Sequence, residues 1–203
     1  MVGASVPHKF DVSAIYMLPF GLSRRFLNKG GVLANIVGGW QLSSALTAYS
    51  GSTFTVTSSA TSLNAPGSPQ RADQTKDKVE ILGGVGPTTP YFDVTAFKSV
   101  TEARFGNTKI NSLRGPGVRN IDLSVIRTLA AGKRNNFQVK VEIFNLMNRP
   151  TFANPTNLNV SNMLLNADGS VQSLNGFGVI NTTQFAGREY SERYVRLGLR
   201  MSF

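Results

Sequence analysis

The sequence predicts an all-β fold, an antiparallel meander sheet of about five to six long strands. Three observations predict it: apolar and polar residues alternate with a period of two, helical periodicity is weak, and the clean stretches are each about ten to twelve residues long. Soluble strands average about five or six residues, whereas a tilted strand needs about 9–11 residues to cross the apolar core of a bilayer. Length and alternation together therefore favour a curved sheet that forms an incomplete segment of a transmembrane β-barrel.

The expected strands share one pattern, in which successive side chains point to opposite sides of the sheet. Four of them alternate cleanly, and the remaining one, residues 32–56, is longer, less regular and rich in small and aromatic residues. The strands are residues 8–19, 32–56, 118–129, 137–148 and 192–203.

The alternation assigns a side of the sheet to individual residues. A charge that faces lipid at mid-depth costs about 2–4 kcal/mol, so charged positions must face a wet lumen if these strands span a membrane. We expect the polar set to face the lumen: Lys9, Asp11, Asp122, Lys140, Glu142, Arg196 and Arg200. We expect the apolar set to face lipid: Phe10, Val12, Tyr16, Leu18, Leu123, Val125, Val139, Val141, Ile143, Val195, Leu197 and Leu199.

The lumen charges allow two interpretations. They either guide an anionic or chelated substrate, or they pair with one another and with other parts of a filled lumen. The sequence leaves both interpretations open.

The connections between the strands alternate between short and long. Residues 20–31 and 130–136 form modest turns, whereas residues 57–117 and 149–191 are long, irregular and rich in Ser, Thr, Asn, Gly and Pro. Loops beyond about 12–15 residues are uncommon in compact soluble domains, but membrane barrels combine short periplasmic turns with long extracellular loops. We therefore expect two long extracellular loops, the first of which contains a short extra strand or packing segment at residues 90–100.

Composition and spacing favour neither catalysis nor nucleic-acid binding. Lys and Arg total 21 against 11 acidic residues, a net charge of +10, but the basic residues are scattered and form no long run. The chain has no cysteine, a single histidine at His8, and no paired carboxylates at catalytic spacing. The stretch RGPG, residues 114–117, lacks the context of a phosphate-binding loop and predicts a turn that leads into a strand. We expect no enzymatic activity, no catalytic or metal-binding residues, no cofactor and no nucleic-acid partner.

The last eight residues, RLGLRMSF, resemble the terminal strand of bacterial outer-membrane barrels. That strand has a polar residue, a glycine two positions later, and hydrophobic residues that end in Phe. The matching residues here are Arg196, Gly198, Met201 and Phe203. The resemblance implies that the barrel-assembly machinery recognises this strand and that the final aromatic ring lies at the membrane interface. The alternative is an ordinary edge strand at the C-terminus.

Further stretches resemble the last strands of one subfamily, the Oar-like TonB-dependent receptors of Gram-negative-type envelopes. They occur in the order of that family and cover nearly the whole chain. The stretches are HKFDVSAIYMLPFG (8–21), GGWQLSSALTAYSGSTFTV (38–56), LRGPGVRNIDLSVIRTL (113–129), FQVKVEIFNLMNRPTFANP (137–155), GFGVINTT (176–183) and the terminal strand.

This resemblance implies uptake of an external nutrient across the outer membrane, in which the chain supplies barrel wall, surface loops and assembly signal. The implied partners are outer-membrane lipid, the rest of the barrel, a plug domain, the barrel-assembly machinery, and a TonB-type energy transducer reached through an N-terminal part. Five strands cannot close a barrel, because even the smallest barrels have eight. We therefore expect the chain to be the C-terminal segment, or fragment, of a longer receptor.

The terminal signal and the loop lengths predict the same orientation. The C-terminus of such barrels is periplasmic in the family, which makes residues 57–117 and 149–191 extracellular. A second hypothesis stays open, because alternation alone also fits a soluble or surface-attached antiparallel β-sandwich that acts in binding or adhesion.

Overall fold

The computed structural model describes residues 5–131, 135–183 and 192–203. The chain divides into two compact units. The strand unit consists of Lys9–Ala48, Arg119–Pro150 and Gly187–Phe203, and the loop unit consists of Met1–His8, Tyr49–Val118 and Thr151–Ala186.

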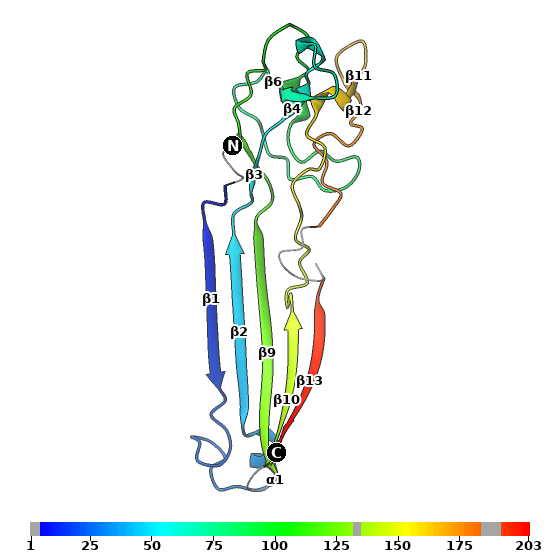
Figure 1. The fold of residues 1–203 in the computed structure, drawn as a ribbon. Coiled ribbons are helices and arrows are strands. Elements are labelled where there is room, and N and C mark those ends of the chain that lie inside the picture. Colours follow the sequence, from blue (N-terminus) through cyan, green and yellow to red (C-terminus); the bar gives the residue numbers. More distant parts are fainter. Residues whose placement is uncertain (1–4, 132–134, 184–191) are drawn as a thin grey trace. The chain divides into compact units, whose positions relative to one another are not determined.

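The strand unit is a five-stranded antiparallel sheet, which confirms the predicted all-β fold class (Figure 1). The strand order is β1-β2-β9-β10-β13, so strands adjacent in space are also consecutive among the long strands of the chain. Within the described residues, no helix is both long enough and apolar enough to cross a bilayer. The strands are β1 (Lys9–Met17), β2 (Trp40–Tyr49), β9 (Val118–Ala131), β10 (Asn135–Phe144) and β13 (Tyr194–Ser202).

The register aligns apolar residues with apolar residues across the last three strands. Val141 of β10 lies opposite Leu197 of β13 and opposite Val125 of β9. One step along β10, Glu142 lies opposite Arg196 and Ser124. Because paired residues point to the same side of a sheet, the apolar row and the polar row occupy opposite faces.

Strands β1 and β2 follow the same rule. The amide of Leu18 donates to the carbonyl of Trp40 (2.9 Å), and the amide of Ser50 donates to the carbonyl of His8 (3.0 Å). Both bonds fit one uninterrupted antiparallel register, which places Tyr16 opposite Leu42. Phe10, Val12, Tyr16 and Leu18 therefore share a face with Trp40.

The expectation of a single strand over residues 32–56 is wrong. The segment contains the short helix α1 (Val32–Val37), then β2, then the short strand β3 (Thr53–Phe54). Gly38 and Gly39 end the helix: Gly39 has φ +75°, and a Cβ on Gly38 would lie 2.5 Å from the carbonyl oxygen of Ala34. Glycine is the residue that tolerates both the left-handed backbone and the close approach.

The expected strand over residues 137–148 stops earlier, at Phe144. Asn145 and Asn148 both adopt φ +50°, a left-handed conformation that Asn tolerates and that leaves the strand. At the other end, β9 extends past residue 129 to Ala131, and β10 begins at Asn135.

The loop unit shows that the segments 57–117 and 149–191 are not irregular along their described length. Residues from both segments form one hydrophobic core around Phe92, which is fully buried. The ring of Phe92 meets Phe97 and Phe177 edge-on, each at 5.7 Å between centroids. The strands pair as β3 with β8 (Leu113–Arg114), β4 (Thr57–Ser59) with β5 (Pro69–Arg71), β6 (Asp73–Gln74) with β7 (Phe97–Lys98), and β11 (Leu164–Leu165) with β12 (Val171–Ser173).

The described part of the loop unit also contains three single-turn 3-10 helices, two of which contribute residues to the core. Val94 of η2 and Val160 of η3 are buried there. The expected packing segment at residues 90–100 therefore contains η2 and β7. The helices are η1 (Thr61–Leu63), η2 (Val94–Ala96) and η3 (Val160–Asn162).

Within the loop unit, the backbone of the RGPG stretch passes very close to the backbone of Gly51. A Cβ on Gly51 would lie 1.9 Å from the carbonyl oxygen of Gly115, so neither segment leaves room for a side chain there. Arg114 holds the two segments together by donating to the carbonyl of Gly51 at 2.7 Å. Gly117 is followed directly by β9, as the sequence predicts.

Candidate functional site

The apolar face of the strand unit is the first candidate interface. Leu197, Leu199 and the terminal Phe203 are 76%, 86% and 94% exposed, although they are large hydrophobic side chains. The register continues this face across the sheet through Val139, Val141 and Val125. Exposed apolar surface of this extent in a soluble protein marks an interaction site, and here it matches the row expected to meet lipid.

The opposite face carries the charges that the sequence assigns to a lumen. The Glu142 carboxylate accepts from Lys140 Nζ at 2.6 Å and from the Arg196 guanidinium at 2.7 Å. The Arg196 guanidinium also lies 5.2 Å from the centre of the Phe144 ring, which stacks on Tyr194 at 6.2 Å. Glu142 therefore neutralises two basic neighbours, and an aromatic pair lies beside them.

The other predicted lumen residues lie on the same face. Lys9 and Asp11 form an ion pair with each other at 3.0 Å. Asp122 accepts from the side-chain amide of Asn120 and from the backbone amide of Asn145, both at 2.9 Å. Among the described residues, Arg200 has no ion-pair partner and lies opposite Gln138. Most of these charges are thus paired within the wall.

The alternation has exceptions that the sequence analysis did not identify. Ile15, Met17 and Ile126 fall on the polar face, and Arg127 falls on the apolar face, where it lies opposite Val139. The Arg127 guanidinium lies 5.4 Å from the Trp40 ring and donates to the carbonyl of Asn35. A long basic side chain can lie along apolar surface while its charged end reaches polar groups, which explains why Arg127 is tolerated there.

The terminal strand places the four residues of the predicted assembly signal along one edge of the sheet. Gly198 lies opposite Lys140, and a Cβ added there would be 3.7 Å from the Lys140 Cβ, an ordinary contact. Packing in the folded sheet therefore does not require a glycine at this position. Its role as part of an assembly signal stays a prediction.

The loop unit contains an ion pair that sequence reasoning missed. Asp73 is buried, with 4% of its side chain exposed, and accepts two hydrogen bonds from the Arg104 guanidinium at 2.9 and 2.6 Å. Arg104 also donates to the exposed carboxylate of Glu102 at 2.6 Å. The hydrogen bonds from Arg104 lower the pKa of Asp73 and outweigh the opposing effect of its burial.

This ion pair predicts an acid-sensitive loop unit. A carboxyl whose pKa is lowered by folding contributes stability above its unfolded pKa, about 4, and loses that contribution as the pH falls through the lower folded value. We expect hydrogen exchange in residues 69–74, corrected for the intrinsic effect of pH, to accelerate below about pH 4. Arg104→Met removes two of the hydrogen bonds that the buried Asp73 carboxylate accepts, and it should accelerate exchange already at pH 7.

Glu102→Gln is the matched control, because it removes only the exposed partner of Arg104 and should cost less than about 1 kcal/mol. Equal effects of the two substitutions at pH 7 would contradict the assignment of Asp73–Arg104 as the stabilising pair.

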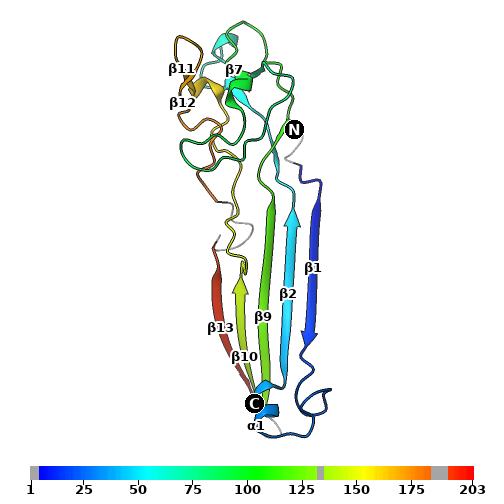
Figure 2. The same ribbon diagram turned by 180° about the vertical axis from the view of Figure 1, so that it is seen from behind.

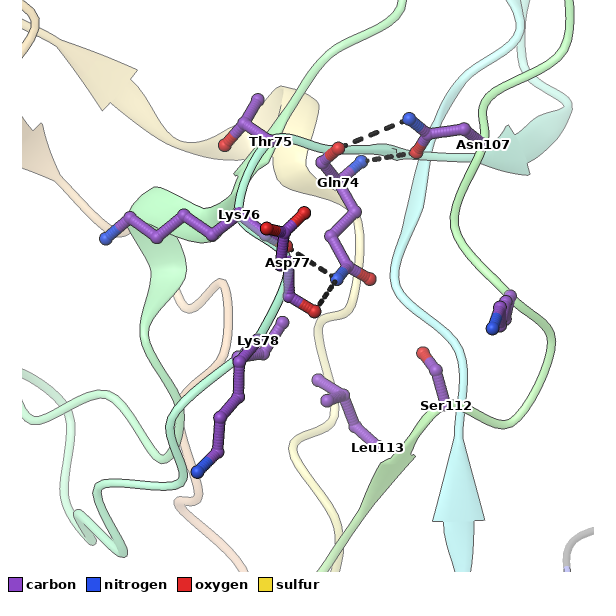
Figure 3. Close-up of a pocket in the computed structure, with 10 residues that line it drawn as sticks. Gln74, Thr75, Lys76, Asp77, Lys78, Asn107, Ser112 and Leu113 are labelled. Carbon is purple, nitrogen blue, oxygen red and sulfur yellow. Dashed lines mark hydrogen bonds between the residues drawn. The ribbon is translucent and has the colours of Figure 1, made fainter.

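A polar cavity of about 550 Å³ lies in the loop unit, lined by Gln74, Lys76, Lys78, Asn107 and Lys109 among others (Figure 3). The backbone amide of Gln74 donates to the side-chain oxygen of Asn107 at 2.7 Å, and the side-chain amide of Asn107 donates to the backbone carbonyl of Gln74 at 3.2 Å. The Asn107 side chain is therefore already used to hold two loop segments together, and the Gln74 side-chain amide donates to the backbone carbonyls of Lys76 and Asp77.

No set of three His, Asp or Glu side chains that could hold a metal ion occurs in the part of the chain that the structure describes. His8, the only histidine of the sequence, takes part in the pairing with Ser50 through its backbone.

A single-layered antiparallel sheet of long strands, with one exposed apolar face and one charged face, defines the wall of a transmembrane β-barrel. The comparison with family models agrees: residues 2–195 match the model of the outer membrane beta barrel domain, and the chain belongs to that family. The protein is accordingly located in the outer membrane, which argues against the soluble β-sandwich. No curated protein and no solved structure was found to match the chain.

Proposed function

We propose that the chain is the C-terminal wall segment of an Oar-like TonB-dependent receptor that takes up a scarce external nutrient. The observation that carries the proposal is the division of the sheet into two faces, together with a last strand that is followed by the exposed Phe203. In this proposal the wall, surface loops and assembly signal come from this chain, and it performs no covalent chemistry. The edges of the sheet, β1 and β13, would pair with the remaining strands of the barrel.

The pairing of charges on the polar face supports a structural role for that face. Glu142 binds both Lys140 and Arg196, and Lys9 binds Asp11. A basic side chain that is already paired with a carboxylate attracts an anionic substrate only weakly, unless the substrate displaces that carboxylate. We therefore assign these residues to the wall of a filled lumen, in contact with a plug domain, and assign recognition of the nutrient to other parts of the receptor.

The loop unit is the proposed extracellular part. Along the chain, β1 and β9 each follow a segment of this unit and β2 precedes one, and the antiparallel pairing places these three strand ends at the same end of the sheet. The turn between β1 and β2 lies at the other end. A packed core in the loop unit fits a surface structure that meets the environment as one folded body.

The orientation predicts which cysteines a membrane-impermeant maleimide labels on intact cells. We expect Lys78→Cys, exposed in the loop unit, to react at once, and Asn28→Cys, exposed in the turn between β1 and β2, to react only after the outer membrane is permeabilised. Both substitutions are at exposed positions, so differences in burial do not explain a difference in labelling. Labelling in the opposite order would overturn the orientation.

The TonB-dependent part of the proposal requires a genetic test. Deletion of the gene of this protein should abolish growth on the scarce nutrient, and so should separate deletion of the energy transducer. The double deletion should have the same growth defect as either single deletion. Collapse of the inner-membrane proton gradient should stop uptake in the wild type. If uptake continued without the transducer, the protein would still be an outer-membrane barrel, but it would not be a TonB-dependent receptor.

A further inference from the structure

The turn between β1 and β2, residues 18–39 (the rim turn), is held by its own backbone hydrogen bonds. The amide of Gly21 donates to the carbonyl of Phe26 and the amide of Phe26 to the carbonyl of Pro19, both at 3.0 Å. The rings of Phe20 and Phe26 lie 5.8 Å apart. The turn ends in α1, which lies at the same end of the sheet as the C-terminus in both views (Figure 1, Figure 2).

Two side chains hold α1 on the apolar face of the sheet. The Trp40 indole donates to the carbonyl of Ile36 at 3.0 Å, and Arg127 donates to the carbonyl of Asn35. Trp40 shares its face with Tyr16 and Leu42, and Arg127 shares its face with Val125 and Val139. The helix is therefore attached on the side that the proposed function assigns to lipid.

The side chains that α1 exposes are apolar. Val32, Leu33 and Ile36 are 77%, 61% and 58% exposed, and Leu22 and Phe26 of the same turn are exposed as well. The exposed side chains of α1 therefore belong to a helix that Trp40 and Arg127 attach to the apolar face of the sheet. Such an exposed apolar surface is what an interfacial segment needs in order to lie in the boundary between acyl chains and headgroups.

The charges of the rim turn are all basic. Arg24, Arg25 and Lys29 are exposed, and the sequence has no Asp or Glu between Asp11 and Asp73. In the described structure these three side chains have no acidic partner; the Arg24 guanidinium contacts Met17 Sδ at 3.7 Å, and the Arg25 guanidinium lies 5.5 Å from the Phe26 ring. Basic residues beside exposed apolar ones are the pattern that anionic lipid headgroups attract.

We propose that the rim turn is a lipid-binding site that selects anionic phospholipid headgroups in the inner leaflet of the outer membrane. Val32, Leu33 and Ile36 enter the acyl boundary, while Arg24, Arg25 and Lys29 bind the phosphate groups. The leaflet assignment rests on the proposed function, because the proposed orientation places the C-terminal end of the sheet on the periplasmic side.

The test uses the assembled barrel in phosphatidylcholine vesicles that contain an equal fraction of either brominated phosphatidylglycerol or brominated phosphatidylcholine, which quench a nearby fluorophore. The chain has no cysteine, so single labels can be placed at Leu33→Cys in the rim turn, Leu199→Cys on the apolar face and Lys78→Cys in the loop unit. The comparison protein carries Arg24→Gln, Arg25→Gln and Lys29→Gln together.

We expect brominated phosphatidylglycerol to quench the label at position 33 with an apparent affinity at least about threefold higher than brominated phosphatidylcholine does. The triple substitution and high salt should both bring this ratio close to one. The label at position 199 should be quenched equally by both lipids in either protein, and the label at position 78 by neither.

The remaining outcomes separate the two proposals. Equal quenching of position 33 by both lipids would show apolar contact without headgroup selection and overturn the inference. Quenching at position 199 without quenching at position 33 would place the rim turn outside the bilayer, against a periplasmic partner, and overturn it while leaving the barrel wall intact. Absence of quenching at both positions would overturn the proposed function itself.

Discussion

Val125→Arg is expected to abolish most of the assembled protein in the outer membrane. Val125 lies near the middle of β9, in the apolar row with Val141 and Leu197. An arginine that faces lipid near the midplane of a barrel costs about 2–4 kcal/mol. The measurement is the amount of heat-modifiable barrel in outer-membrane fractions, together with urea unfolding from lipid vesicles.

Ser124→Arg is the matched control, because the neighbouring residue lies at the same depth on the opposite face. Ser124 lies opposite Glu142 on the polar face, so an arginine there faces water and a charged cluster rather than lipid, and we expect near-normal assembly. If Ser124→Arg failed and Val125→Arg assembled normally, the two faces would be assigned the wrong way round.

Deletion of Phe203 should reduce the assembled barrel severalfold with little effect on a barrel that has already formed. Phe203 follows the last strand and is 94% exposed, so its removal takes away almost no packing within the described structure. A large loss of assembly would then report recognition by the assembly machinery. Pulse-labelled cells, sampled for heat-modifiable protein over time, separate slow assembly from an unstable product.

Phe203→Tyr and Gly198→Ala complete this series. Tyrosine keeps an aromatic ring suited to the membrane interface and should restore most of the assembly. Gly198→Ala introduces a Cβ that the folded sheet accommodates at an ordinary contact distance, so any assembly defect would come from the recognition step. Normal assembly of the Phe203 deletion would show that β13 is an ordinary edge strand.

The long strands could be predicted from the sequence because each repeats a two-residue pattern over most of its length. In β10 the pairs Val139–Lys140 and Val141–Glu142 alternate without interruption, and the register keeps the two sets apart. The prediction failed where that pattern gives no information, as in residues 32–56. Two adjacent glycines, Gly38 and Gly39, divide this segment, and the helical turn before them is too short for helical periodicity to show.

The core of the loop unit could not be predicted from the alternation of apolar and polar residues. Its strands are only two or three residues long, so no period can be measured, and its central contacts join Phe92 to Phe177 across a wide sequence separation. The ion pair between Asp73 and Arg104 depends on the same tertiary contacts. The richness of the segments in Ser, Asn and Gly predicted loops, whereas their aromatic and aliphatic residues form a buried core.

Arg127 illustrates the limit of alternation for the candidate site. Its position in the register is one that an apolar residue should occupy, and its neighbour Ile126 occupies a polar one. The tertiary contacts of Arg127 with the Trp40 ring and with the carbonyl of Asn35 explain why a basic residue is accepted on the apolar face. A signal was present in the sequence, since Arg127 lies near the end of its strand, where a charged side chain can reach a polar boundary.

The chain contains one tryptophan, and its position gives the protein an intrinsic spectroscopic reporter. Trp40 touches the backbone of α1 on one side and the guanidinium of Arg127 on the other. Its emission wavelength during refolding into vesicles would therefore follow one local event, the joining of α1 to β2 and β9. A stopped-flow trace of that signal would give the moment at which this corner of the wall forms, without any added dye.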